Sequence, residues 1–155
     1  MRFYSVIIPV FNRPDEVDEL LESLTQQSYT AFEVLIIEDG STLRCEEIVT
    51  KYKEKLSLTY HYKENSGQGF SRNMGFEMAK GDFYLVFDSD CLIPKHYFQA
   101  VEEFLDQDQV DAFGGPDKAH KSFSPIQKAI SYSMTSVFTT GGIRGNQQHY
   151  GTFHP

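Results

Sequence analysis

The sequence predicts an α/β fold in which helices cover both faces of a mostly parallel sheet. Short runs of β-branched and aromatic residues alternate along the chain with segments whose apolar residues recur at helical spacing. Strand, helix and strand in succession form right-handed crossovers, which place the strands parallel. The length of 155 residues suits one domain with a core of its own.

The first elements lie before the middle of the chain. Residues 4–9 form a β-branched run that is typical of a strand buried on both faces. A helix is expected over residues 14–27, because apolar residues recur there at helical spacing among acidic ones. Residues 33–37 repeat the strand pattern, residues 46–55 repeat the helical pattern, and residues 58–62 alternate as a third strand.

The same alternation continues into the second half. Residues 69–80 are predicted as a helix, residues 83–87 as the fourth strand, and residues 95–106 as a further helix. A fifth strand is expected at residues 110–113 and a helix over residues 124–138. The remaining residues have no strong period, which indicates a loop or tail.

The composition excludes several classes of protein. Twenty-two acidic residues against 14 basic ones give a net charge of −8, which argues against a general nucleic-acid binder. Cys45 and Cys91 form no zinc or disulfide pattern, so we expect reduced thiols in a cytosolic protein. No apolar run approaches the roughly 20 residues of a membrane span, so none is expected here.

The strongest chemical motif is Asp88-Ser89-Asp90, directly after the fourth strand. In extended backbone, side chains two residues apart project to the same side, so both carboxylates can converge on one cation. Mg²⁺ is often held by one or two carboxylates together with substrate phosphates. The alternative is a simple turn, for which Asp and Ser are also suitable.

Two more motifs follow other strands. Asp39, in the segment 38–41, can accept hydrogen bonds from a base N–H or a ribose hydroxyl, but Ser41 or Thr42 could equally cap the next helix. Segment 65–75 only superficially resembles the dinucleotide GxGxxG motif, because Arg72 occupies the third glycine position.

Single residues in these loops allow two interpretations. Arg72 and Asn73 can contact an anion or a base from the first turn of a helix, although a surface arginine is the simpler reading of Arg72. Pro9 fixes the backbone at the end of the first strand and Phe11 offers an aromatic face there. Helix entry is a sufficient explanation for Asn12.

Taken together, these motifs resemble the family 2 glycosyltransferases. The resemblance implies the GT-A nucleotide-diphospho-sugar transferase fold, a Rossmann-like three-layer α/β/α arrangement. The motifs run in family order over residues 4–115, and four ordered motifs are more specific than any one. The matching segments are 5–12, 38–41, 71–75 with 79–82, and the DxD motif at 88–90.

The resemblance also implies roles for particular residues. The segment from Pro9 to Asn12 and Asp39 would hold the base, usually uracil, and Asp90 would bind Mn²⁺ or Mg²⁺ that bridges the diphosphate. Asp88 would approach the ribose or the sugar and would share the metal site. The expected donor-binding residues are Pro9, Val10, Phe11, Asn12, Asp39, Gly67, Arg72, Asn73, Asp88, Ser89 and Asp90.

By the same resemblance, the reaction would move a sugar from a nucleotide-diphospho-sugar, with UDP as the expected nucleotide, to a hydroxyl acceptor with inversion. Residues 1–115 would bind the donor, and residues 116–155 would begin an incomplete acceptor half. The general base is expected beyond Pro155, since Asp117 is the only acidic residue in that stretch and comes too early for the family motif. The acceptor would be a saccharide or lipid-linked, at a cytoplasmic location, either free or at the membrane face.

Three other functions fit parts of this pattern. A nucleotidyltransferase would carry a Gly-rich basic loop after the first strand, and a signalling receiver domain would carry an acidic pair there, whereas this chain has residues 9–14, Pro-Val-Phe-Asn-Arg-Pro. A fragment that binds the donor without turnover is the third, because the expected base is missing.

Overall fold

The computed structural model describes residues 2–107, 110–114 and 124–135. The chain divides into two compact units, Met1–Gln109 and Val110–Pro155. The first unit contains a four-stranded parallel sheet with the strand order β3-β2-β1-β4. Its strands are β1 (Tyr4–Val10), β2 (Phe32–Asp39), β3 (Leu58–Lys63) and β4 (Phe83–Val86).

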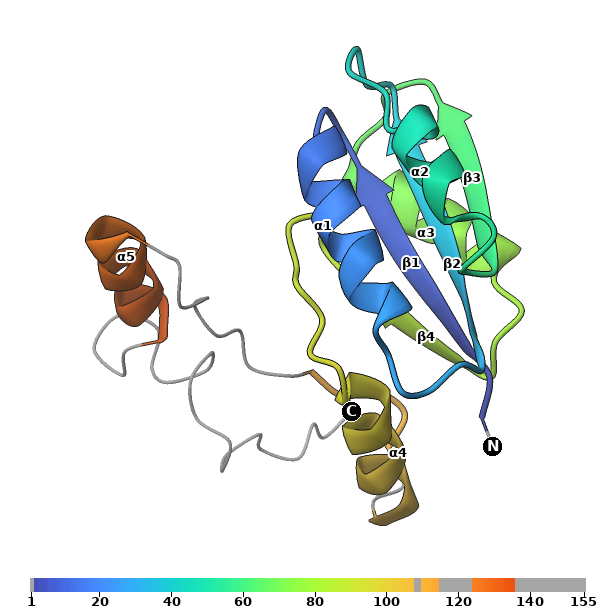
Figure 1. Ribbon diagram of the computed structural model, residues 1–155, viewed down its shortest axis with the longest axis vertical. Coiled ribbons are helices and arrows are strands. Elements are labelled where there is room, and N and C mark those ends of the chain that lie inside the picture. Colours follow the sequence, from blue (N-terminus) through green and yellow to red (C-terminus); the bar gives the residue numbers. More distant parts are fainter. Residues whose placement is uncertain (1, 108–109, 115–123, 136–155) are drawn as a thin grey trace, which may run out of the picture. The chain divides into compact units, whose positions relative to one another are not determined.

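Helices lie on both faces of this sheet. Helices α1 and α2 cover one face and α3 covers the other (Figure 1). The predicted three-layer α/β/α arrangement is therefore confirmed for the first unit. The helices of this unit are α1 (Pro14–Thr25), α2 (Glu46–Tyr52), α3 (Gln68–Met78) and α4 (Tyr97–Gln107), and the second unit contains α5 (Pro125–Thr135).

The central strands explain why the sheet forms. Every residue of β1 and β2 is buried, as expected of parallel strands that are covered on both faces. Side chains of α1, α2 and α4 fill the larger core, whereas α3 closes a smaller one around Ile7, Leu35 and Ile37. Helix α3 approaches β1 closely, because a Cβ atom on Gly75 would lie 2.3 Å from Ile7 Cγ2.

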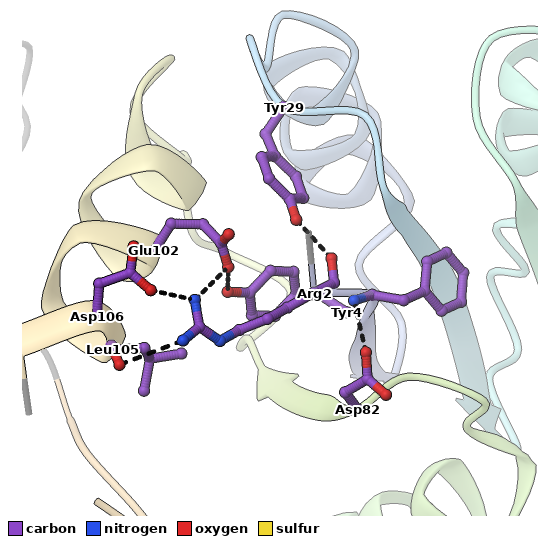
Figure 2. A network of polar contacts seen from close by, with 8 residues as sticks. Arg2, Tyr4, Tyr29, Asp82, Glu102, Leu105 and Asp106 are labelled. Carbon is purple, nitrogen blue, oxygen red and sulfur yellow. Dashed lines mark hydrogen bonds and ion pairs between the residues drawn. The ribbon is translucent and has the colours of Figure 1, made fainter. Parts of the chain in front are cut away.

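Helix α4 is tied to the beginning of β1 by a polar network (Figure 2). Arg2 donates from Nη1 to Asp106 Oδ1 at 2.8 Å and to Glu102 Oε1 at 3.4 Å. The Tyr4 hydroxyl also donates to Glu102, and burial, with this bond, raises the pKa of Tyr4. The network lies at the start of β1. It therefore stabilises the end of the sheet opposite the carboxyl ends of the strands.

Segment 79–82, which contributes to the family resemblance, connects the end of α3 to the start of β1 by hydrogen bonds. The backbone N–H groups of Lys80 and Gly81 donate to Ser5 Oγ at 3.1 and 2.8 Å. The Ser5 hydroxyl donates in turn to the buried Glu33 at 2.7 Å. These bonds hold the turn between α3 and β4 against the first residues of β1.

Some sequence predictions were wrong or lie outside the described residues. Residues 110–113 form no strand: their backbone is irregular, with Val110 and Phe113 exposed, and no neighbouring strand pairs with them in the described part of the chain. Asp117 and the predicted 136–138 end of the last helix lie outside the described residues. In the part that is described, no helix has the length and apolar character needed to cross a membrane.

Candidate functional site

A cleft of about 420 Å³ lies at the carboxyl ends of β1, β2 and β4. Open parallel sheets bind ligands at this edge, and the volume suits a small-molecule site. Its lining combines the ends of three strands with the loop that precedes α3. The lining residues are Pro9, Val10, Phe11, Arg13, Asp39, Asn65, Gly67, Gln68, Asp88, Ser89 and Asp90.

Asn12 is not among the lining residues but fixes two of the loops that carry them. Its Oδ1 accepts hydrogen bonds from the Thr42 N–H at 2.8 Å, the Thr42 hydroxyl at 3.0 Å and the Leu43 N–H at 2.9 Å. Its own N–H donates to Ser41 Oγ at 2.9 Å, and its φ of 54° is one that asparagine tolerates. The alternative that Ser41 or Thr42 caps the next helix is wrong, because α2 begins after Cys45 without a side-chain cap.

Asp39 holds the loop between β3 and α3 in place. Its carboxylate accepts hydrogen bonds from the Ser66 and Gly67 N–H groups at 2.9 and 2.8 Å and pairs with Lys63. Burial alone would raise the pKa of Asp39, but the Lys63 and backbone hydrogen bonds outweigh it and lower the pKa below its usual value. Asp39 is therefore a fixed anion, and its Oδ2 atom accepts a hydrogen bond from Gly67 alone among the described residues, which leaves it a free lone pair.

The turn after Asp39 requires glycine. Gly40 has a φ of 72°, and a Cβ atom there would lie 2.6 Å from the Asn65 backbone nitrogen. This close approach lets the Asn65 side chain donate from Nδ2 to the Asp39 carbonyl at 2.9 Å. The part of the cleft lined by Asp39, Asn65 and Gly67 is thus held together by hydrogen bonds between side chains and backbone.

Glu38 points away from the cleft. It is fully buried and accepts a hydrogen bond from the Cys45 N–H, at 3.2 Å to each carboxylate oxygen. The Tyr60 hydroxyl donates to the same carboxylate, and burial, with this bond, raises the pKa of Tyr60. A carboxylate next to the first N–H groups of a helix is electrostatically favourable, so Glu38 holds the start of α2.

The motif at residues 88–90 is a turn and also contributes to the cleft. Strand β4 ends at Val86, and the Cys91 N–H donates to the Asp88 carbonyl at 3.2 Å. The expectation of an extended backbone is therefore wrong, because the chain must turn here toward α4. Asp88, Ser89 and Asp90 nevertheless all line the cleft.

Each carboxylate of this motif is paired with a different arginine. Asp88 Oδ1 accepts from Arg72 Nη2 at 2.9 Å and from Gln68 Nε2 at 3.1 Å. Asp90 Oδ2 accepts from Arg13 Nη1 at 2.8 Å. Arg72 is thus engaged with the motif and is no isolated surface arginine, although it does not line the cleft itself.

The two carboxylates are suited to a divalent cation that a ligand also binds. Their side chains are 58% and 55% exposed, which leaves further oxygen lone pairs accessible. No set of three or more His, Cys, Asp or Glu side chains in the described part of the chain could enclose a metal ion. Mn²⁺ or Mg²⁺ at Asp88 and Asp90 would therefore complete its shell with phosphate oxygens and water.

The structure brings most of the expected site residues together. Asn12 does not line the cleft but holds the loop after β2, and Arg72 does not line it but donates to Asp88. Asn73 is exposed and lies outside the lining. Sequence analysis missed Arg13, Asn65 and Gln68. Arg13 follows the first strand directly, so its position at a strand end was a usable signal, whereas the role of Asn65 depends on the close approach of Gly40.

Comparisons with known proteins agree with this architecture. The sequence profile of "Glycosyl transferase family 2" matches residues 5–154. The poly(ribitol-phosphate) β-N-acetylglucosaminyltransferase TarS of Staphylococcus aureus strain Mu50 is 31% identical over 97% of this chain and 30% of TarS. An uncharacterised glycosyltransferase of Haemophilus influenzae is 42% identical over 59% of this chain and 31% of its own.

Solved structures give the same result. The crystal structure of S. aureus TarS 1–349 in complex with UDP-GlcNAc has a TM-score of 0.66 and 34% identity, over 74% of this chain and 37% of that one. The mannosyltransferase PcManGT from Pyrobaculum calidifontis, in complex with GDP-Man and Mn²⁺, has a TM-score of 0.57 and 26% identity, over 60% of this chain and 29% of that one.

The chain spans about 30% of the length of the TarS sequence that it matches. The profile match covers nearly the whole chain and decides against the receiver and nucleotidyltransferase alternatives. The sheet order, the cleft and the motifs around it are consistent with that match. The chain belongs to glycosyl transferase family 2 and has the α/β architecture of its GT-A relatives.

Proposed function

We propose that this chain binds the nucleotide-sugar donor of a glycosyltransferase, with a UDP-sugar as the expected donor. One observation carries the proposal: Asp39, Asp88 and Asp90 line a single cleft at the carboxyl ends of parallel strands. The relatives support it, because TarS has been crystallised with UDP-GlcNAc and with UDP.

The base would bind in the part of the cleft nearest β1 and β2. Asp39 is a charged acceptor with a free lone pair, which suits the N3–H group of uracil. Phe11 is 51% exposed at the cleft and offers an aromatic face to the base. The loop at residues 66–67 is already held by Asp39, so it can contact the ribose without rearrangement.

The diphosphate would lie near β4. Asp88 and Asp90 would hold Mn²⁺ or Mg²⁺, and the cation would neutralise the charge that develops on the departing diphosphate. Arg72 and Gln68 keep the Asp88 carboxylate oriented toward the cleft. In support, the structure of PcManGT contains GDP-Man and Mn²⁺.

The proposed reaction is one displacement with inversion at the anomeric carbon. The bond from this carbon to the diphosphate oxygen breaks and its electron pair stays on that oxygen. The acceptor hydroxyl oxygen bonds to the carbon from the opposite face, and its proton passes to a carboxylate base.

Donor binding without transfer is the second candidate. It is favoured by one observation: residues 118–155 contain no Asp or Glu to serve as the base. Incubation of the 155-residue chain with UDP-sugars and saccharide or lipid-linked acceptors separates the two candidates, because detectable transfer would require a base within this chain.

Isothermal titration calorimetry with UDP tests the donor site. We expect UDP to bind in the presence of Mn²⁺ and the affinity to fall at least about tenfold with EDTA or in Asp90→Asn, since a charged ligand contact is lost. Glu54→Gln is the control, because it removes an exposed carboxylate outside the cleft lining. Absence of binding with Mn²⁺, or unchanged binding in Asp90→Asn, would contradict the proposal.

A further inference from the structure

Arg13 has an unusual position in the cleft. Among the described residues, it is the only lysine or arginine that lines the cleft. It stands directly before the first turn of α1, and its guanidinium donates to Asp90 Oδ2 at 2.8 Å. A second acidic neighbour, Glu16, lies at 3.9 Å.

We propose that Arg13 binds the donor's diphosphate, and that it pairs with Asp90 only until a divalent cation takes that carboxylate. The proposal rests on the proposed function and adds a residue and an exchange to it. The Asp90 carboxylate would lose its hydrogen bond from Arg13 and coordinate the cation instead. The freed guanidinium of Arg13 would then donate hydrogen bonds to a phosphate oxygen of the donor.

The exposure of the ion pair makes such an exchange easy. The side chains of Arg13 and Asp90 are 46% and 55% exposed, and solvent-exposed ion pairs contribute little to stability. A divalent cation bound to Asp90 would also repel the guanidinium. Arginine suits the new partner, because its planar fork matches phosphate oxygens in a bidentate geometry.

The other carboxylate of the motif is held more firmly. Asp88 has two partners, Arg72 and Gln68, whereas Asp90 accepts a hydrogen bond only from Arg13 in the described part of the chain. The Arg72 side chain is also more enclosed, because its Nε atom is buried and it is 36% exposed, whereas Arg13 is 46% exposed. Arg13 is therefore the arginine that can leave its carboxylate.

Charge balance supports the same assignment. The carboxylates of Asp88 and Asp90 together carry two negative charges, and the diphosphate of a nucleotide sugar brings two more into the same cleft. A divalent cation and the guanidinium groups of Arg13 and Arg72 neutralise all four. Without Arg13, the donor complex would keep an excess negative charge in a protein that is already acidic overall.

Calorimetry on Arg13→Ala tests the exchange through two opposite effects. UDP with saturating Mn²⁺ should bind roughly tenfold more weakly, because a charged contact to phosphate is lost. Mn²⁺ alone should bind about two- to threefold more tightly, because a competing positive charge has left Asp90. Arg13→Lys should lie between Arg13→Ala and the wild type in both titrations.

Lys51→Ala is the control, since it removes one exposed positive charge on α2 outside the cleft lining, and it should change neither affinity. Melting temperatures of all variants identify any that fail to fold. The proposal is overturned if Arg13→Ala binds UDP–Mn²⁺ as the wild type does, or if both its affinities fall together. Failure of the wild type itself to bind UDP–Mn²⁺ would refute the proposed function instead.

Discussion

Replacing Gly75 by alanine should disturb the contact between α3 and β1 more than any exposed substitution. The added Cβ atom would lie 2.3 Å from Ile7 Cγ2, far inside van der Waals contact. Ile7 is fully buried and β-branched, so its side chain cannot swing away and the helix must move. Overpacking of this kind costs about 1–3 kcal/mol, and we expect a value of about 2–3 kcal/mol here.

Gly69→Ala is the matched control on the same helix. Apart from its chain neighbours and the backbone of its own helix, no atom lies within 4 Å of the position of its Cβ, so the substitution should be neutral or stabilise the protein by up to about 1 kcal/mol. Urea unfolding followed by circular dichroism measures both variants. For a unit of this size, the loss in Gly75→Ala corresponds to a fall in melting temperature of roughly 10–20 °C.

A double variant isolates the cause. In Gly75→Ala with Ile7→Ala, the clash is removed, so the combined loss of stability should be smaller than the sum of the two single losses. Additive losses, or a Gly75→Ala variant as stable as Gly69→Ala, would refute the close-approach argument.

Three further predictions concern the surroundings of the cleft. Asn12→Ala should lose about 1–3 kcal/mol in urea unfolding, because three hydrogen bonds lose their acceptor, and Asn12→Asp should restore most of it. The stability advantage of the wild type over Asp39→Asn should be full at neutral pH and shrink as the pH falls below about 3.8 toward the lowered pKa of Asp39; an advantage that does not shrink with pH in this range would contradict this. Tyr60→Phe should cost about 1–2 kcal/mol by removing a partner of the buried Glu38. Because the pKa of Tyr60 is raised, its contribution is present below about pH 10 and is lost at higher pH, so the variant should lose less stability there than the wild type.

The sequence was sufficient to predict the strands and helices whose apolar pattern lies within their own residues. Strands β1 and β2 are buried on both faces, which leaves an uninterrupted apolar pattern, and the four helices of the first unit lie close to where their periodicity predicts them. The apolar residues at 110–113 carry a similar signal, but a strand also needs a neighbour to pair with, and the sequence of the segment does not contain that information.

The site was predictable only in part for the same reason. Side chains after strands could be expected to gather, because parallel strands end at one edge. The contact of Arg13 with Asp90 joins residues 77 positions apart, and Asp39 is occupied by backbone groups of residues 66 and 67. Neither arrangement follows from a local pattern.

The loops that Asn12 and Asp39 hold together have a kinetic consequence. Both residues cross-link their loops through hydrogen bonds that require no ligand, so this wall of the cleft is ordered before a nucleotide arrives. A preorganised wall loses little conformational entropy on binding. Nucleotide association should therefore proceed in a single concentration-dependent phase, and any slower step should belong to the exchange of Arg13 between Asp90 and phosphate.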